Sequence, residues 1–189
     1  MSKLPPPMAV LVGRGIAREM FKGQALVMVP NCGWTGHECD VLVVTKDLRV
    51  IDVEVKASYA DLVRDAGKDK WWARKHGQRT ALEHPPRAWK HWYAVSEQAW
   101  RDGAFQGLPP ASGVMLWRDG TGVDRHDWSK AGLLSIRKPT PNKNAKPLTP
   151  AEAIDIARLA SLRLWDEYLR QGQEPKFGKP RNVINKEPR

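Results

Sequence analysis

Cysteine is scarce in this chain, with only Cys32 and Cys39 among 189 residues. A secreted scaffold held by disulfides needs more, so that class is excluded and both thiols are expected to be free. No apolar run reaches the roughly 18 residues that a transmembrane helix requires. The first residues, MSKLPPPMAVLVGRG, carry too short an apolar stretch and too much proline for a signal peptide. We therefore expect a cytoplasmic protein that makes no contact with a membrane.

Acidic residues are the minority among the charges. Asp and Glu number 21 against 31 Lys and Arg, which gives a formal net charge of +10. Such a field attracts polyanions, and nucleic acid is the partner it favours. A basic protein without a polyanionic ligand remains an open alternative, because charge alone does not decide. Hydrophobic residues at 41% and charged residues at 28% are typical of a globular chain with one core, which excludes disorder throughout.

The first half of the chain alternates between helical and strand patterns. Apolar spacing predicts a helix over residues 8–22, ending at Gly23, and then strands over 25–30, 39–45 and 50–57. The sequence KDLR between the last two strands predicts a hairpin turn. Ser58 followed by Asp61 resembles a capping box, so we expect a second helix from Ser58 to Arg74 or beyond.

The second half predicts further strands over 91–96, 113–117 and 133–139, which makes a mixed sheet. Residues 1–140 thus form the expected core, and residues 141–148 form a proline-rich linker. Thr149, Pro150 and Glu152 begin a C-terminal helix over 149–172. An apolar stripe should dock this helix on the core, formed by Ile154, Ala157, Leu164, Trp165 and Tyr168. Residues 173–189 are expected to be a flexible basic tail.

The strand over 50–57 carries charges on one face only. Val53 and Val55 point one way, while Asp52, Glu54 and Lys56 point the other. An E-x-K pair alone is common on a solvated strand, where it forms surface ion pairs. The chemical interest of this face depends on the neighbouring strand.

Asp40 begins that neighbouring strand, and the hairpin between Asp40 and Glu54 brings both acids to one side of the sheet. Hydrolysis of a phosphodiester needs a divalent cation, and Mg²⁺ takes hard oxygen ligands such as carboxylates. We predict a Mg²⁺ site, in which Mn²⁺ can substitute, formed by Asp40, Glu54 and the carbonyl of Val55. Lys56 would orient the attacking water or offset the charge that develops in the transition state.

Asp40 followed by E-V-K at 54–56 resembles the signature of the PD-(D/E)xK nuclease superfamily, with Cys39 in place of the nominal proline. The resemblance implies an α/β fold with a restriction-endonuclease-like core, in the order αβββαβ, and a mixed central sheet flanked by helices. In this chain, the predicted C-terminal helix and basic tail are added to that core. It also implies a metal-dependent endonuclease that hydrolyses DNA, with Asp40, Glu54 and Lys56 as catalytic residues.

The continuation E-V-K-x-S-x-x-D-x-x-x-D, then Lys70 with Trp71, then H-W-Y-A-V-S, resembles the MmcB-like DNA repair branch of this superfamily over residues 13–140. Extra residues between Asp65 and Lys70 and a tryptophan-rich stretch up to Trp92 depart from that pattern. The resemblance implies a role in DNA repair or phage-type DNA metabolism.

Further site residues follow from position. Asp52 is either a third acid or a charge on the rim, and the rim is favoured; Glu19 adds an acid from the first helix or is an exposed helix residue. Additional candidates near the metal are Glu19, Asp52, Ser58 and Asp61. The candidates for contact with nucleic acid are Lys70, Trp71, Arg74 and Lys75.

Four alternatives stay open or are set aside. Cys32, His37 and Cys39 lack the four ligands and the Cys-x₂₋₄-Cys pair of a structural zinc site, so zinc is not expected. A DNA-binding accessory protein with little activity would keep the same fold. In a protein-interaction module, the charges would serve only solubility. A homodimer would explain paired cuts in duplex DNA, although no heptad pattern supports it.

Overall fold

A computed structural model describes residues 23–65, 67–75, 77–101, 108–117 and 133–171, together with Gly13, Gly15 and Ile16. The helix expected over 8–22, Glu19 within it, and the basic tail over 173–189 fall largely or wholly outside these residues. Ile16 is fully buried in the core.

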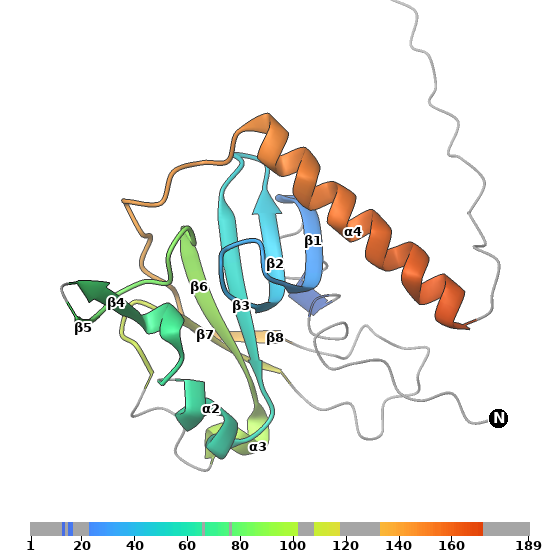
Figure 1. Cartoon of the computed structure of the whole chain (residues 1–189). Helices are drawn as coiled ribbons and strands as arrows, with labels where there is room; N and C mark the ends of the chain where they lie inside the picture. The colour runs from blue at the N-terminus through green and yellow to red at the C-terminus, as the bar shows by residue number, and fades with distance from the viewer. Residues whose placement is uncertain are drawn as a thin grey trace, which may run out of the picture.

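A six-stranded mixed sheet forms the body of the molecule (Figure 1). Its order is β1-β2-β3-β6-β7-β8, with antiparallel pairing at both edges and parallel pairing of β3 with β6 and of β6 with β7. The strands are β1 (Ala25–Cys32), β2 (Cys39–Thr45), β3 (Val50–Lys56), β6 (Lys90–Ser96), β7 (Gly113–Trp117) and β8 (Leu133–Arg137). Every strand expected from the sequence is present, and the chain is a mixed α/β protein.

The hairpin between β2 and β3 sets the register of the candidate site. Its turn is closed by Thr45 N–H donating to the carbonyl of Arg49 at 3.0 Å, and Leu48 takes a positive φ of 58°. The ladder pairs Leu42 with Asp52 and ends at Val41 with Val53. The turn predicted for KDLR is confirmed.

The crossover from β3 to β6 differs from the prediction. The cap is confirmed, since Ser58 Oγ accepts the Asp61 N–H at 3.2 Å, but helix α2 (Tyr59–Asp65) ends well before Arg74. A short 3₁₀ turn, η2 (Asp69–Trp71), and a hairpin of β4 (Trp72–Lys75) and β5 (Gln78–Ala81) follow. Gly67 weakens a continuing helix, and Gly77, at φ 77°, supplies the left-handed residue of the hairpin turn.

Helix α4 (Pro150–Gln171) begins at the predicted cap, where Thr149 Oγ1 accepts the Glu152 N–H at 3.2 Å and Glu152 Oε2 accepts the Thr149 N–H at 2.9 Å. It packs beside β1 (Figure 1). The predicted docking face of α4 is wrong, because Ile156 is fully buried while Ile154, in the predicted stripe, is 68% exposed. Ala153, Leu159 and Ala160 complete the contact, and Leu164 and Trp165 are exposed.

The segment over 141–148 runs along the body. The Asn142 N–H donates to the carbonyl of Trp89 at 2.7 Å, and the Leu148 N–H donates to the carbonyl of Leu48 at 2.7 Å. Leu148 is buried under α4. The segment is therefore bonded at one end to the residue before β6 and at the other to the β2–β3 turn.

The two faces of the sheet are packed differently. One face carries a continuous apolar cluster that includes Val41, Val53, Trp92 and Met115. The other carries two apolar clusters, one under α4 around Leu42 and Ile156 and one beside α2, while helix α3 (Glu97–Arg101) contacts β6 and β7. Charged side chains of β3 and polar side chains of β6 are also buried in the body. In the part of the chain that the structure describes, no helix is both long and apolar enough to cross a membrane.

Candidate active site

Strand β3 buries three charged side chains on one face. Asp52 and Glu54 are 0% exposed and Lys56 is 2% exposed. Lys70 Nζ lies 2.6 Å from Glu54 Oε1 and 4.0 Å from Asp52 Oδ2, and Lys56 Nζ lies 2.7 Å from Glu54 Oε2. These contacts confirm the shared face that the alternation predicts. They also show that Asp52 is buried, so the favoured rim position is wrong.

Asp65, the last residue of α2, is the second acid of this ionic cluster, which we define as Glu54, Asp65, Lys56, Lys68 and Lys70. Asp65 Oδ1 lies 3.0 Å from Lys56 Nζ and 2.9 Å from Lys68 Nζ, while Lys68 Nζ also reaches Glu54 Oε2 at 3.1 Å. Lys68 is the most exposed member, with 48% of its side chain exposed. Two buried acids therefore share three lysines.

Strand β6 and the 3₁₀ turn supply polar partners from above the cluster. Tyr93 Oη donates to Asp65 Oδ2 at 2.6 Å, and Trp71 Nε1 donates to the same oxygen at 3.2 Å. Burial would raise the pKa of Asp65, but Lys70, Lys56 and the Tyr93 hydroxyl outweigh it and hold this pKa well below its ordinary range. The Asp65 carboxylate is therefore charged at neutral pH.

Glu54 follows the same electrostatic pattern. Its burial favours the neutral acid, but Lys70 and Lys56 lower its pKa below the ordinary value despite the nearby charge of Asp52. The pKa of Lys56 is raised, because Glu54 and Asp65 outweigh the cost of burying its ammonium group. The cluster is thus a set of ionised groups.

Asp40 stands apart from the lysines. Its Oδ2 accepts the N–H of Val55 at 2.6 Å, just beyond the last β2–β3 pair. Burial and the neighbouring charge of Glu54 raise the pKa of Asp40, against the Val55 hydrogen bond and the more distant Lys56. Among the described residues Asp40 has no ion-pair partner. Its side chain is half-buried.

Asp52 has a different set of neighbours. His37 Nε2 lies 3.0 Å from Asp52 Oδ2, and His91 Nε2 lies 3.8 Å from the same oxygen. His91 Nδ1 is 2.9 Å from Ser112 Oγ, and Lys70 Nζ is 3.4 Å from His91 Nε2. Burial raises the pKa of Asp52, but His91 and His37 lower it more strongly. The resulting pKa lies well below the usual range of an aspartate.

The remaining predicted site residues are scattered. Lys70 and Trp71 are 4% exposed and face the cluster, and the contact with nucleic acid expected of them stays a prediction. Arg74 is exposed and Lys75 ends β4. Ser58 caps α2, and Asp61 pairs with Arg64 at 3.6 Å on the surface. Neither Ser58 nor Asp61 contacts the cluster.

Several residues of the site were not among the predicted metal or catalytic residues: Asp65, Lys68, His37, His91 and Tyr93. A signal existed for two of them, because His91 and Tyr93 alternate on a predicted strand and must share a face. In the parallel pairing of β3 with β6, His91 lies opposite Asp52 and Tyr93 opposite Glu54. The sequence gives no direct sign of which strand neighbours β3.

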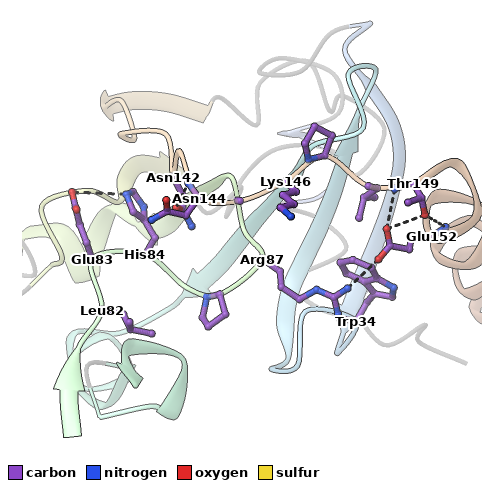
Figure 2. Close-up of a pocket in the computed structure, with 14 residues that line it drawn as sticks. Trp34, Leu82, Glu83, His84, Arg87, Asn142, Asn144, Lys146, Thr149 and Glu152 are labelled. Carbon is purple, nitrogen blue, oxygen red and sulfur yellow. Dashed lines mark hydrogen bonds and ion pairs between the residues drawn. The ribbon is translucent and has the colours of Figure 1, made fainter. Parts of the chain in front are cut away.

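A groove of about 670 Å³ lies elsewhere, between residues 82–87 and the segment over 142–149 (Figure 2). Arg87 stacks on Trp34, with its guanidinium carbon 3.9 Å from the ring centroid, and pairs with Glu152 at 3.1 Å. None of the lining residues belongs to the ionic cluster. The groove and the cluster are therefore separate features.

The chain is thus a mixed α/β protein with a buried ionic cluster on the central strand of its sheet. No family model matches it, and no curated protein matches it either. A solved structure, the SPO1766 protein of unknown function from Silicibacter pomeroyi, is similar with a TM-score of 0.52 and 19% identity. The match covers 94% of this chain and 100% of that chain. At this identity the likeness concerns the fold alone.

Proposed function

We propose that this protein is a metal-dependent nuclease of the PD-(D/E)xK type, with a restriction-endonuclease-like core, that hydrolyses DNA phosphodiester bonds. The observation that carries the proposal is the bond from Val55 N–H to Asp40, at 2.6 Å. Val55 lies between Glu54 and Lys56, so this bond fixes the acid of β2 beside the acid and the amine of β3. The resemblance to the MmcB-like branch supports a role in DNA repair or phage-type DNA metabolism.

The donor set suits Mg²⁺, with Mn²⁺ as a substitute. Asp40 and Glu54 offer carboxylate oxygens, and the carbonyl of Val55 offers a third oxygen. The raised pKa of Asp40, caused by burial and by Glu54, indicates two carboxylates that repel each other at neutral pH. A divalent cation held by both would remove that repulsion, and when bound it would polarise the phosphate and lower the pKa of a bound water.

The side chains of the protein supply the rest. Lys56 is held between Glu54 and Asp65 and keeps its proton, so it stabilises negative charge and does not act as a base. Lys68 is half exposed and bonded to both acids, which suits it to meet a phosphate that enters from solvent. Asp65 pairs with Lys56 and Lys68, and Tyr93 donates to Asp65, so both side chains help to orient the lysines.

The test is cleavage of single-stranded, duplex and branched DNA by the purified chain in Mg²⁺ or Mn²⁺. We expect Asp40→Asn and Lys56→Met to reduce the rate by roughly a hundredfold or more. Asp61→Asn, which removes an exposed acid of α2, is the matched control and should retain full activity. Circular dichroism of each variant separates lost chemistry from lost folding. Wild-type activity in folded Asp40→Asn would refute the proposal.

A second candidate is a DNA-binding accessory protein with little activity. The observation that favours it is the complete pairing of Glu54, whose two oxygens contact Lys56, Lys68 and Lys70 and whose side chain is 1% exposed. For this function DNA binding should not need metal and should weaken steeply with added salt, because phosphate contacts release counterions. Binding without cleavage under all metal conditions would select this candidate.

A further inference from the structure

A group of three ligand-bearing side chains lies next to Asp52, outside the Asp40–Glu54 pair. His37 comes from the loop between β1 and β2, Cys39 begins β2, and Asp52 is in the middle of β3. One donor atom from each lies within 4.8 Å of the others. His37 Nε2 and Asp52 Oδ2 lie 3.0 Å apart.

The buried carboxylate in this group is only partly satisfied by hydrogen bonds. Asp52 and Cys39 are 0% exposed, and Asp52 Oδ1 has no hydrogen-bond partner among the described residues. Leaving a buried carboxylate oxygen unbonded is costly, since it has lost its water without a replacement. His37 retains 15% of its side-chain exposure and so leaves a route from solvent to the group.

The donors are an imidazole nitrogen, a thiol sulfur and a carboxylate oxygen. Mg²⁺ prefers oxygen alone, whereas Zn²⁺ is commonly bound by this mixture in four-coordinate sites. Thr35 Oγ1 donates to the carbonyl of His37 at 3.0 Å and lies 3.4 Å from Cys39 Sγ, which holds the loop over the group. Cys32, the other cysteine, is absent from the group of donors.

We propose that His37, Cys39 and Asp52 form a Zn²⁺ site, separate from the Asp40–Glu54 pair, with water at the fourth position. Binding forms a bond from zinc to the Cys39 sulfur and releases the thiol proton to solvent. Asp52 and Glu54 are two residues apart on β3, roughly 7 Å along the strand. The two sites would therefore be neighbours on one strand face.

The test uses Co²⁺ as a spectroscopic probe on the full chain after treatment with a chelator. We expect one thiolate-bound Co²⁺ per chain, with tetrahedral d–d bands and a thiolate-to-cobalt charge-transfer band that added Zn²⁺ removes. Cys39→Ser should abolish the charge-transfer band, and His37→Gln, a change in a surface loop, should weaken binding roughly tenfold or more. Cys32→Ser, the matched cysteine control, should keep the band.

Three results would overturn this proposal. They are no charge-transfer band in the wild-type chain, a band that survives in Cys39→Ser, and a band lost in folded Cys32→Ser. Asp40→Asn distinguishes the two sites, because it removes an acid of the magnesium pair and should leave the Co²⁺ spectrum unchanged. Loss of the spectrum in Asp40→Asn would mean one shared site and would refute the separate zinc site, whatever the outcome of the cleavage assays.

Discussion

The electrostatics around β3 can be tested by measuring how the free energy of unfolding changes with pH, because His91 is a buried titratable group. The imidazole is 1% exposed, and burial lowers its pKa from 6.5 to about 4, helped by Lys70 and opposed by Asp52. In the unfolded chain the same group takes up a proton near pH 6.5. The unfolded state therefore binds more protons between these two values, and the free energy of unfolding should fall as the pH falls from about 6.5 to about 4.

The magnitude follows from the two pKa values of His91. One pKa unit corresponds to about 1.4 kcal/mol, so the full effect approaches about 3 kcal/mol, of which about 2 kcal/mol is lost between pH 7 and pH 5. This window lies above the range in which Asp52 and Asp65 contribute, because their pKa values are lowered. Their stabilisation is present above the ordinary aspartate pKa and is lost only at lower pH.

Urea denaturation at several pH values between 5 and 7 measures this slope. His91→Gln keeps a polar group near Ser112 but cannot titrate, so its free energy of unfolding should lose about 2 kcal/mol of the pH dependence. His84→Gln, a substitution in the groove and outside the cluster, is measured beside it to show the effect of losing a histidine elsewhere. If His91→Gln keeps the wild-type slope, the buried neutral imidazole is not the cause and the reasoning fails.

Three further predictions concern the stability of the same body. Tyr93→Phe removes a hydrogen bond to the buried Asp65 carboxylate and should lower the free energy of unfolding, measured in urea, by about 1.5–3 kcal/mol. Tyr59→Phe, at an exposed residue, should change it by no more than about 0.5 kcal/mol, and equal effects of the two substitutions would contradict the role of the Tyr93 hydroxyl. Ile156→Ala should lower the free energy of unfolding by about 2–5 kcal/mol, whereas Leu169→Ala, at a side chain that is 79% exposed on the same helix, should leave it nearly unchanged. The reverse order would show that α4 docks by another face. Asp40→Asn should raise the melting temperature at pH 7, because its raised pKa means that the ionised carboxylate opposes folding, and a lower melting temperature would argue against that.

The strands were predictable because each carries its own signal. Alternation in Val50–Lys56 and short apolar runs in β2, β6 and β7 depend on local sequence, and the structure has all of them. The end of α2 at Asp65 was not predictable, because Lys68 and Lys70 also fit the period of a continuing helix. Their contacts with Glu54 and Asp65 belong to tertiary structure, which a local period does not contain.

The same limit applies to α4 and to the site. Ile154 and Ile156 are both apolar, and only the position of β1 decides that Ile156 is buried. For the site, spacing along two adjacent strands was enough to bring Asp40, Glu54 and Lys56 together as candidates. His91 was missed because its contact with Asp52 arises from a parallel pairing across residues 57–89, which leaves no mark on either segment.

That parallel pairing also has a kinetic consequence. Antiparallel β2 and β3 meet through a short turn, but β3 and β6 can pair only after the intervening chain has closed a long loop, and contacts of this kind form slowly. Until β3 and β6 pair, no contacts offset the cost of removing the carboxylates of β3 from water. The ionic cluster should therefore assemble late, as one of the last steps of folding, and substitutions within it should speed unfolding more than they slow folding.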